Sequence, residues 1–238
     1  MPPGATAGGI AVVIDVLRAS TTIVTALAHG AAALRPVAAI EEARRLAGTL
    51  GGGTLLGGER GGTRIEGFDL GNSPREYGRD RVAGRTIVIT TTNGTAALAA
   101  CDEAREIVIG ALVNRRAVAD TVRRLAVETG ASDVHLVCAG TDGMVSAEDV
   151  LAAGAILDAA APGHDDDVLD AAARRALADY RSLAAAADPR AALLAAFRTS
   201  PGGANLLPLG MEADLAVAAE VDALAIVPRL DRASGSLH

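Results

Sequence analysis

The chain has no lysine and no tryptophan, and its aromatic residues are two phenylalanines and two tyrosines. Without lysine, chemistry that needs a P-loop lysine, a Schiff base or a lysine general base is excluded. All 22 basic residues are arginine, in no run longer than a pair, and the net charge is −7. We expect no nucleic-acid partner, because the chain offers neither a basic surface nor aromatic side chains for base stacking.

Cysteines and long apolar runs are also scarce. Cys101 and Cys138 lie in apolar stretches and are not spaced like zinc ligands, which predicts reduced thiols in a cytoplasmic protein. No apolar run approaches the length that spans a membrane, and the N-terminus lacks the basic region of a signal peptide. We therefore expect a cytoplasmic protein without a membrane partner. The sequence leaves the oligomeric state open, including a homo-oligomer.

Strand-like apolar runs alternate with segments of helical spacing. The strand-like runs cover residues 9–16, 34–40, 54–59, 86–91, 106–112, 133–140 and 223–228. The helical segments cover residues 20–32, 41–50, 94–101, 115–128, 146–160, 165–199 (with a break at Asp188-Pro189) and 211–220. This alternation predicts an α/β fold, a three-layer α/β/α arrangement with a mainly parallel sheet. We expect residues 1–238 to form a single compact domain, and recurring strand-to-turn motifs leave open two similar intertwined lobes.

Polar and glycine-rich motifs follow four of the predicted strands. They are IDVLRAST at 14–21, GGERGG at 57–62, TTTNGT at 90–95 and CAGTDG at 138–143. Ligands bind beyond the carboxyl ends of parallel strands, so we expect these motifs to share one site. The Gly-, Arg- and Asp-rich segment at 60–85 adds a long loop, and such loops in compact domains are usually functional or disordered.

Each motif also has a structural alternative. Asp15 and the hydroxyls at 20–22 can cap a turn or a helix, and Asn93-Gly94 is a common turn. Glu148 and Asp149 lie in a predicted first helical turn, where acids complement the helix dipole without catalysing anything. Convergence of several motifs at one sheet edge is stronger evidence for a site than any single motif.

Familiar catalytic motifs are missing. No G-x-G-x-x-G follows a strand and no G-x-S-x-G elbow occurs, so neither a dinucleotide site nor that type of serine hydrolase is supported. The remaining set of acids, arginines, hydroxyls and glycine-rich backbone suits an anionic substrate and a hard cation such as Mg²⁺.

Together, VVIDVLRASTTI, GGERGG, GFDLGNSPREY, TTTNGT and CAGTDGMVSAEDVLAAGAI resemble the 2-phosphosulfolactate phosphatase family over roughly residues 10–157. A weaker likeness continues through GMEADLAVAAEVDALAIVP. The resemblance implies an α/β phosphoric monoester hydrolase that converts 2-phospho-3-sulfolactate to 3-sulfolactate and phosphate with Mg²⁺, a step toward coenzyme M in methanogens. The family also occurs in bacteria that do not make coenzyme M this way. Phosphatase activity on another small phospho-acid, or non-catalytic anion binding on the same scaffold, are therefore the alternatives.

Within this resemblance, the motif residues take expected roles. The expected catalytic residues are Asp15, Arg18, Glu59 and Arg60. The expected Mg²⁺ ligands are Asp15, Glu59 and Asp149, with Glu148 as a substitute. The expected substrate-binding residues are Ser20, Thr21, Asp69, Asn72, Ser73, Thr92, Asn93, Gly94, Thr95, Gly140 and Thr141, of which Asp69, Asn72 and Ser73 alternatively hold the long loop closed.

The substrate's acid groups call for arginines, since arginine binds such groups bidentately. Arg18 and Arg60 are best placed, with Arg64 and Arg75 of the long loop as further options. Two mechanisms remain open: in-line attack by a Mg²⁺-bound water whose proton a carboxylate takes, or attack by Asp15 to form an aspartyl phosphate. The water route is favoured because DVLR lacks the second aspartate of the known aspartyl-phosphate motif.

Overall fold

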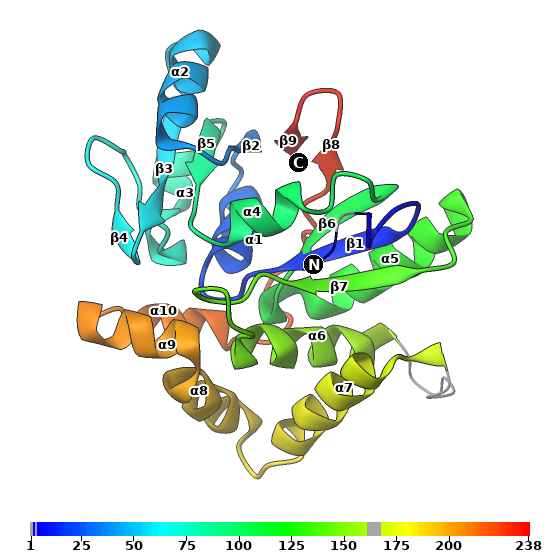
Figure 1. The fold of residues 1–238 in the computed structure, drawn as a ribbon. Coiled ribbons are helices and arrows are strands. Elements are labelled where there is room, and N and C mark those ends of the chain that lie inside the picture. The colour runs from blue at the N-terminus through cyan, green and yellow to red at the C-terminus, as the bar shows by residue number, and fades with distance from the viewer. Residues whose placement is uncertain (1, 3, 161–167) are drawn as a thin grey trace.

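Two sheets, rather than one, organise the chain in the computed structural model, which describes residue 2 and residues 4–160 and 168–238 (Figure 1). The first sheet is parallel, in the order β6 (Glu106–Gly110), β1 (Ile10–Ile14), β7 (Val134–Cys138). The second has the order β4 (Thr63–Arg64), β3 (Leu55–Arg60), β5 (Thr86–Thr90), β2 (Ala33–Pro36), β9 (Ser236–Leu237), β8 (Leu230–Asp231).

The predicted α/β class is confirmed. The predicted three-layer arrangement around one mainly parallel sheet is not confirmed, because the strands divide between two sheets and some of them pair antiparallel. In the second sheet β3, β5 and β2 are parallel, whereas the two-residue strands β4, β8 and β9 pair antiparallel.

Helices follow most strands. They are α1 (Ala19–Ala28), α2 (Ile40–Leu50), α3 (Arg79–Val82), α4 (Gly94–Ala99), α5 (Arg115–Thr129), α6 (Ala147–Ala160), α7 (Ala171–Ala184), α8 (Pro189–Thr199), α9 (Pro201–Leu206) and α10 (Glu212–Ala218). Short 3₁₀ turns are η1 (Pro74–Glu76), η2 (Leu112–Asn114) and η4 (Leu207–Leu209). None of the helices described is both long and apolar enough to cross a membrane.

On the C-terminal side, one predicted helical stretch agrees with the structure where it is described, and one predicted strand does not. The predicted helical stretch 165–199 begins outside the described residues and is then divided at Asp188-Pro189, as expected, where Asp188 caps α8 by accepting the Ala191 backbone N–H. The predicted strand at 223–228 is wrong. That segment makes isolated backbone hydrogen bonds, including one from the Leu224 N–H to Val113, instead of a ladder.

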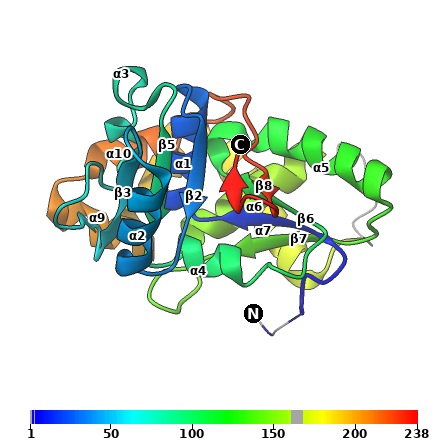
Figure 2. The same cartoon turned by 90° about the horizontal axis from the view of Figure 1, so that it is seen from above.

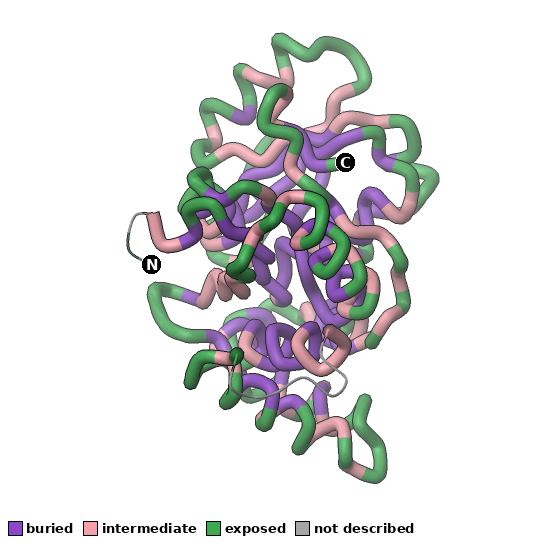
Figure 3. The backbone as a smooth tube through the Cα atoms, turned by 90° about the vertical axis from the view of Figure 1, so that its right-hand side faces the viewer, coloured by how far each residue is buried: buried purple, intermediate pink, exposed green. Residues whose placement is uncertain are grey.

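Helix α1 lies between the two sheets and has almost no solvent face, since residues 19–27 are all buried (Figures 1 and 2). Side chains of β1 alternate between two cores, as strand geometry requires. Val12 packs in the core that includes α5, α6 and α8, and Val13 packs in the core shared by α1, β5 and β6. Buried residues fill the interior and exposed residues follow the periphery (Figure 3).

The outer face of the second sheet is covered by α2. There Ala43 of α2, Val88 of β5 and Phe68 of the long loop form a separate small core. The layers therefore alternate between helices and sheets, and the carboxyl ends of β1, β3, β5 and β7 can be traced to one region through hydrogen bonds.

Candidate active site

Asp15 follows β1 directly and is 7% exposed. Its backbone N–H donates to Ser20 Oγ at 2.9 Å, and the backbone N–H of Ala19 donates to its Oδ1 at 3.2 Å. The Ser20 backbone N–H also donates to the Asp15 carbonyl at 2.8 Å. These bonds fix the Asp15 side chain at the start of α1, and no residue that the structure describes donates a hydrogen bond to its Oδ2.

Gly94 allows α4 to approach Asp15. A Cβ atom built at Gly94 would lie 2.7 Å from Asp15 Oδ2 and 2.6 Å from the Cβ of Ala19. Both distances are closer than real Cβ contacts allow, so this position needs glycine. The TTTNGT motif therefore ends next to the carboxylate that follows β1, on the same side of the molecule.

Glu59 joins the ends of β3 and β5. Its Oε1 accepts the backbone N–H of Thr92 at 2.7 Å, and its Oε2 accepts the backbone N–H of Gly62 at 2.8 Å. Glu59 is 7% exposed. Both carboxylate oxygens are thus engaged in holding the two strand ends and the turn after β3.

Asp149 has the same role on the first sheet. It lies in the first turn of α6, and its Oδ1 accepts the backbone N–H of Val16 at 2.8 Å. Its Oδ2 accepts the backbone N–H of Gly140 at 3.0 Å. Asp149 therefore ties the ends of β1 and β7 together.

Glu148 differs from its neighbour. Its Oε1 accepts the backbone N–H of Gly202 at 3.1 Å and so fixes the start of α9. Its Oε2 is buried and has no hydrogen-bond partner. A buried carboxylate oxygen without a partner is rare in proteins, since such a group loses its hydration without replacement.

The acids of the site repel one another. The pKa of Asp15 is raised to about 7, mainly by burial; the Ala19 N–H opposes this shift, and the charges of Glu59 and Glu148 contribute to it. Burial and the charge of Asp15 hold the pKa of Asp149 well above its usual range. Burial also raises the pKa of Glu148. Such shifts cluster at functional sites, although structural networks cause them too.

Arg18 is 3% exposed and joins three segments. Its Nη1 donates to Asp214 Oδ2 at 2.7 Å and to Met211 Sδ, and its Nη2 donates to the Gly62 carbonyl at 2.6 Å. Ser73 Oγ donates to the other oxygen of Asp214 at 2.7 Å. Arg18 therefore connects the turn between β1 and α1 to the long loop and to α10.

Arg60 is not brought beside Arg18. Successive residues of a strand point to opposite faces, so Arg60 leaves β3 on the side away from Glu59. It donates to the carbonyls of Glu59 and Ala38 and to Thr90 Oγ1. Of the further options, Arg64 is exposed and donates to the Asp69 carbonyl at 3.4 Å, and Arg75 is also exposed.

The predicted hydroxyl residues bind backbone groups or each other. Thr21 Oγ1 donates to the Val16 carbonyl, and Thr95 Oγ1 donates to the Thr91 carbonyl. Thr141 Oγ1 accepts the hydroxyl of Ser146. Together with the Ser20 contact to Asp15, these bonds shape the turns around the site. By contrast, Thr92 is exposed at the mouth of the site, with Asn93 partly exposed beside it.

Two residues of the long loop behave differently from one another. Asp69 is exposed, and its Oδ2 accepts the Leu56 backbone N–H at 2.8 Å, which closes the loop against β3. Asn72 is 4% exposed, its carbonyl accepts the Thr22 hydroxyl, and its Oδ1 is buried without a partner. The side-chain oxygen of Asn72 can thus still accept a hydrogen bond.

Asp214 was not predicted from the sequence. It lies in the first turn of α10 and is 2% exposed. Within GMEADLAVAAE it is one of two first-turn acids, a position where acids are common for reasons of the helix dipole alone. Its partner Arg18 is 196 residues away, so only the folded chain distinguishes it.

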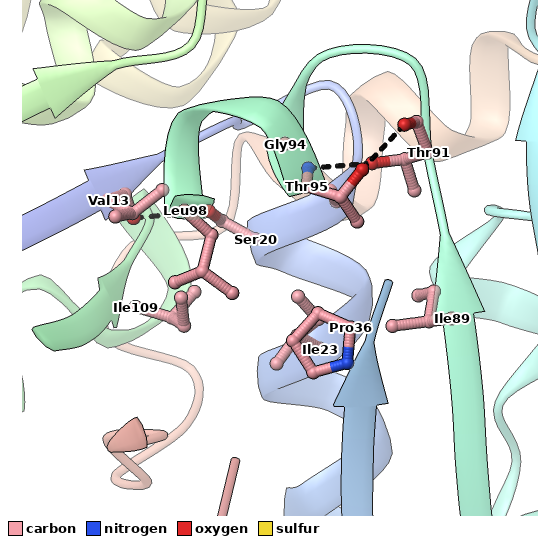
Figure 4. Close-up of a pocket in the computed structure, with 11 residues that line it drawn as sticks. Val13, Ser20, Ile23, Pro36, Ile89, Thr91, Gly94, Thr95, Leu98 and Ile109 are labelled. Atoms are coloured by element: carbon pink, nitrogen blue, oxygen red, sulfur yellow. Dashed lines mark hydrogen bonds between the residues drawn. The ribbon is translucent and has the colours of Figure 1, made fainter. Parts of the chain in front are cut away.

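An apolar cavity lies beneath the site, between α1, α4 and the strands of both sheets (Figure 4). Val13, Ile23, Ile89, Leu98 and Ile109 are among the residues that line it. Its volume of about 10 Å³ is at the lower limit for a single water. The cavity is therefore a packing gap behind Gly94 and not a site for an anionic substrate.

The acid set can be tested for its fit to a metal ion. In the described part of the chain, no three His, Cys, Asp or Glu side chains are arranged to hold a metal. Two acids nevertheless have an oxygen without a hydrogen bond, Asp15 Oδ2 and Glu148 Oε2. Because Mg²⁺ is commonly held by only one or two carboxylates plus waters and substrate phosphates, this donor set fits it.

A family model described as 2-phosphosulpholactate phosphatase matches residues 2–233. The chain belongs to this family. Three relatives, each named a probable 2-phosphosulfolactate phosphatase, support the assignment. The one from Deinococcus radiodurans is 46% identical over 222 residues, covering 93% of this chain and 87% of the relative.

The relative from Symbiobacterium thermophilum is 43% identical over 227 residues, covering 93% of this chain and 91% of the relative. The one from Caldicellulosiruptor saccharolyticus is 38% identical over 205 residues, covering 86% and 82%. The resemblance seen in the sequence motifs is thus confirmed at the level of the 2-phosphosulfolactate phosphatase family.

Proposed function

We propose that the chain hydrolyses 2-phospho-3-sulfolactate to 3-sulfolactate and phosphate, as a phosphoric monoester hydrolase of the cytoplasm. The family match over residues 2–233 carries this proposal. The four buried acids that converge after the strands support the reaction class, because phosphoryl transfer depends on positioned charges.

We infer that Mg²⁺ is the cofactor, held by Glu148 together with waters and oxygens of the substrate phosphate. When bound, the cation would supply positive charge beside a group of buried carboxylates, where burial and, to a smaller extent, the neighbouring negative charges raise the pKa of Asp15. Glu59 and Asp149 have a different part in this proposal. Their oxygens are engaged by backbone N–H groups, so they hold the strand ends that carry the site.

Asp15 is the proposed general base. Its Oδ2 is uncommitted, its side chain is fixed by Ser20 and Ala19, and its raised pKa suits proton transfer near neutral pH. In the proposed step Asp15 Oδ2 takes a proton from the attacking water as the water oxygen bonds to phosphorus. The phosphorus–oxygen ester bond breaks, the 3-sulfolactate oxygen leaves and takes up a proton from solvent, and Asp15 releases its proton to solvent.

The substrate phosphate is proposed to lie against the start of α4. No described residue accepts a hydrogen bond from the backbone N–H groups of Asn93 and Gly94. Backbone N–H groups of this kind bind phosphate oxygens.

The test is phosphate release by the purified protein from 2-phosphosulfolactate and from a panel of phospho-acids that lack the sulfonate. Release should be fastest from 2-phosphosulfolactate, should stop after treatment with EDTA and should return with Mg²⁺. Faster release from another phospho-acid would reassign the substrate. Full activity after rigorous chelation would refute the role of the cation, and no release from any of the compounds would refute the phosphatase function.

A further inference from the structure

One buried ion pair has no part in the chemistry proposed so far. Arg18 Nη1 and Asp214 Oδ2 lie 2.7 Å apart, and both side chains are 2% exposed. Burying two charges is unfavourable unless the geometry and additional hydrogen bonds compensate. Here both partners have such bonds: Ser73 donates to Asp214, and Gly62 accepts from Arg18.

The donors of Arg18 are only partly used. A guanidinium has five N–H groups. Two on Nη1 are taken by Asp214 and Met211, and one on Nη2 by the Gly62 carbonyl. The Nε–H and one N–H of Nη2 have no partner among the described residues. Free donors on two bonded groups of one guanidinium can each donate to an oxygen of a carboxylate, phosphate or sulfonate.

We propose that Asp214 is a positioning residue that fixes Arg18 so that its free Nε and Nη2 donors bind one acid group of the substrate. This inference rests on the proposed function and adds to it a residue from the C-terminal helices. Asp214 also offsets the charge of Arg18. Arg18 would therefore select its anion by the direction of its hydrogen bonds more than by surplus charge.

Three variants separate positioning from other roles. Asp214→Ala frees Arg18 to move. Asp214→Asn can still accept from Arg18 through Oδ1 and donate to Ser73 Oγ through Nδ2, so it keeps the geometry and removes only the charge. Glu212→Ala is the matched control, because Glu212 lies on the same helix and makes an exposed ion pair with Arg198.

The readouts are steady-state kinetics with 2-phosphosulfolactate, and calorimetric binding of 3-sulfolactate and of inorganic phosphate. For Asp214→Ala the Michaelis constant should rise about 10- to 100-fold with turnover changed less than about fivefold. For Asp214→Asn it should stay within about threefold of wild type, or fall, because the offsetting charge is gone. Glu212→Ala should match wild type.

Weaker binding of either probe by Asp214→Ala supports the proposal, and the affected probe identifies the acid group that Arg18 binds. If Asp214→Ala does not fold, Ser73→Ala removes one hydrogen bond to Asp214, and its Michaelis constant should rise about three- to fivefold. The proposal is overturned if the Michaelis constant of Asp214→Asn rises as much as that of Asp214→Ala, if Asp214→Ala loses turnover while its Michaelis constant is unchanged, if neither probe binds Asp214→Ala more weakly, or if wild-type protein binds neither probe. Wild-type phosphate release decides the phosphatase function separately, and the binding comparison does not depend on it.

Discussion

Among single residues, Asp15 combines burial with a carboxylate oxygen that no described residue bonds. Asp15→Asn keeps the shape of the side chain and its acceptor for the Ala19 N–H, but it cannot take a proton. We expect turnover to fall about 10²- to 10⁴-fold, with a small change in the Michaelis constant. Steady-state kinetics with the exposed Asp120→Asn variant as a control check this, and near-normal turnover in Asp15→Asn would remove Asp15 from the chemical step.

Glu148 and Glu59 should respond differently to loss of charge. Glu148→Gln changes the acid whose Oε2 has no partner, so Mg²⁺ affinity should weaken at least about tenfold with a modest effect on folding. Glu59→Gln places an amide N–H₂ against a backbone N–H, so it should lower the free energy of unfolding by about 1–3 kcal/mol. Its Mg²⁺ affinity should stay close to wild type.

Calorimetric titration with Mg²⁺ and chemical denaturation measure the two effects. The reverse result, with Mg²⁺ affinity lost in Glu59→Gln and kept in Glu148→Gln, would assign the cation to the strand ends instead.

The sequence pointed to Asp15 and Glu59 as candidate site residues but not to Asp214. Asp15 and Glu59 follow strands, and the carboxyl ends of parallel strands gather ligands whichever sheet holds them. Which oxygen remains free cannot be read from a motif, because it depends on backbone N–H groups contributed by distant turns, such as Gly202 for Glu148. Asp214 was missed for the same reason, because its role depends on a buried ion pair with Arg18, which is far away in the sequence.

Among the elements, α4 packs closely against the turn that joins β1 to α1. Gly94→Ala would place a Cβ 2.7 Å from Asp15 Oδ2. We expect it to lower the free energy of unfolding by about 1–3 kcal/mol, as overpacking does, and to reduce turnover at least about tenfold by displacing the carboxylate.

Gly48 of α2 provides a control of opposite sign. Nothing lies within 4 Å of a Cβ built there. Gly48→Ala should therefore raise the free energy of unfolding by about 0.5–1 kcal/mol through helix propensity and leave turnover unchanged. Denaturant unfolding and phosphate release measure both variants, and equal stability of the two would contradict the contact at Gly94.

The hydroxyl residues of helix α1 do not cap the helix, although their motif suggested that role. Its small hydroxyl residues suggested caps, yet the N-cap residue is Arg18, which makes no side-chain capping bond. Thr21 and Thr25 instead donate to carbonyls of the preceding turn. Hydroxyls behave this way when a helix has no access to water, because each buried polar group needs a partner within the protein.

At the scale of the whole molecule, buried thiols should weaken the fold at alkaline pH. Burial raises the pKa of Cys101 from 9.0 to about 11, with a further contribution from Asp102. Above pH 9 the unfolded chain releases this proton while the folded chain retains it, so the free energy of unfolding falls as pH rises from 9 toward 11. The loss from this group is on the order of 1–3 kcal/mol.

Cys101→Ala should remove that part of the slope. Denaturant unfolding at pH 7, 9 and 11 measures it, and the pH 7 value separates the cost of the missing sulfur from the effect of titration. An unchanged slope in Cys101→Ala would assign the alkaline instability to other groups.

The α/β class was predictable from the whole chain, but the division into two sheets was not. Hydrophobic alternation shows that a strand exists, whereas its partners depend on contacts far apart in sequence. Val12 and Val13 are adjacent residues of the same type, yet their side chains pack in different cores. A helix as apolar as α1 can lie outside a single sheet or between two, and the pattern fits both arrangements.

The place of β1 has a consequence for how the chain is made. β1 ends at residue 14, while its partners β6 and β7 begin at residues 106 and 134. Synthesis proceeds at about 5–20 residues per second, so β1 waits several seconds on the ribosome before its partner strands are made. Until then, the apolar strand β1 lacks the two strands with which it pairs in the folded chain. The strand that ends just before Asp15 therefore has both of its neighbours only after residue 138 has been made.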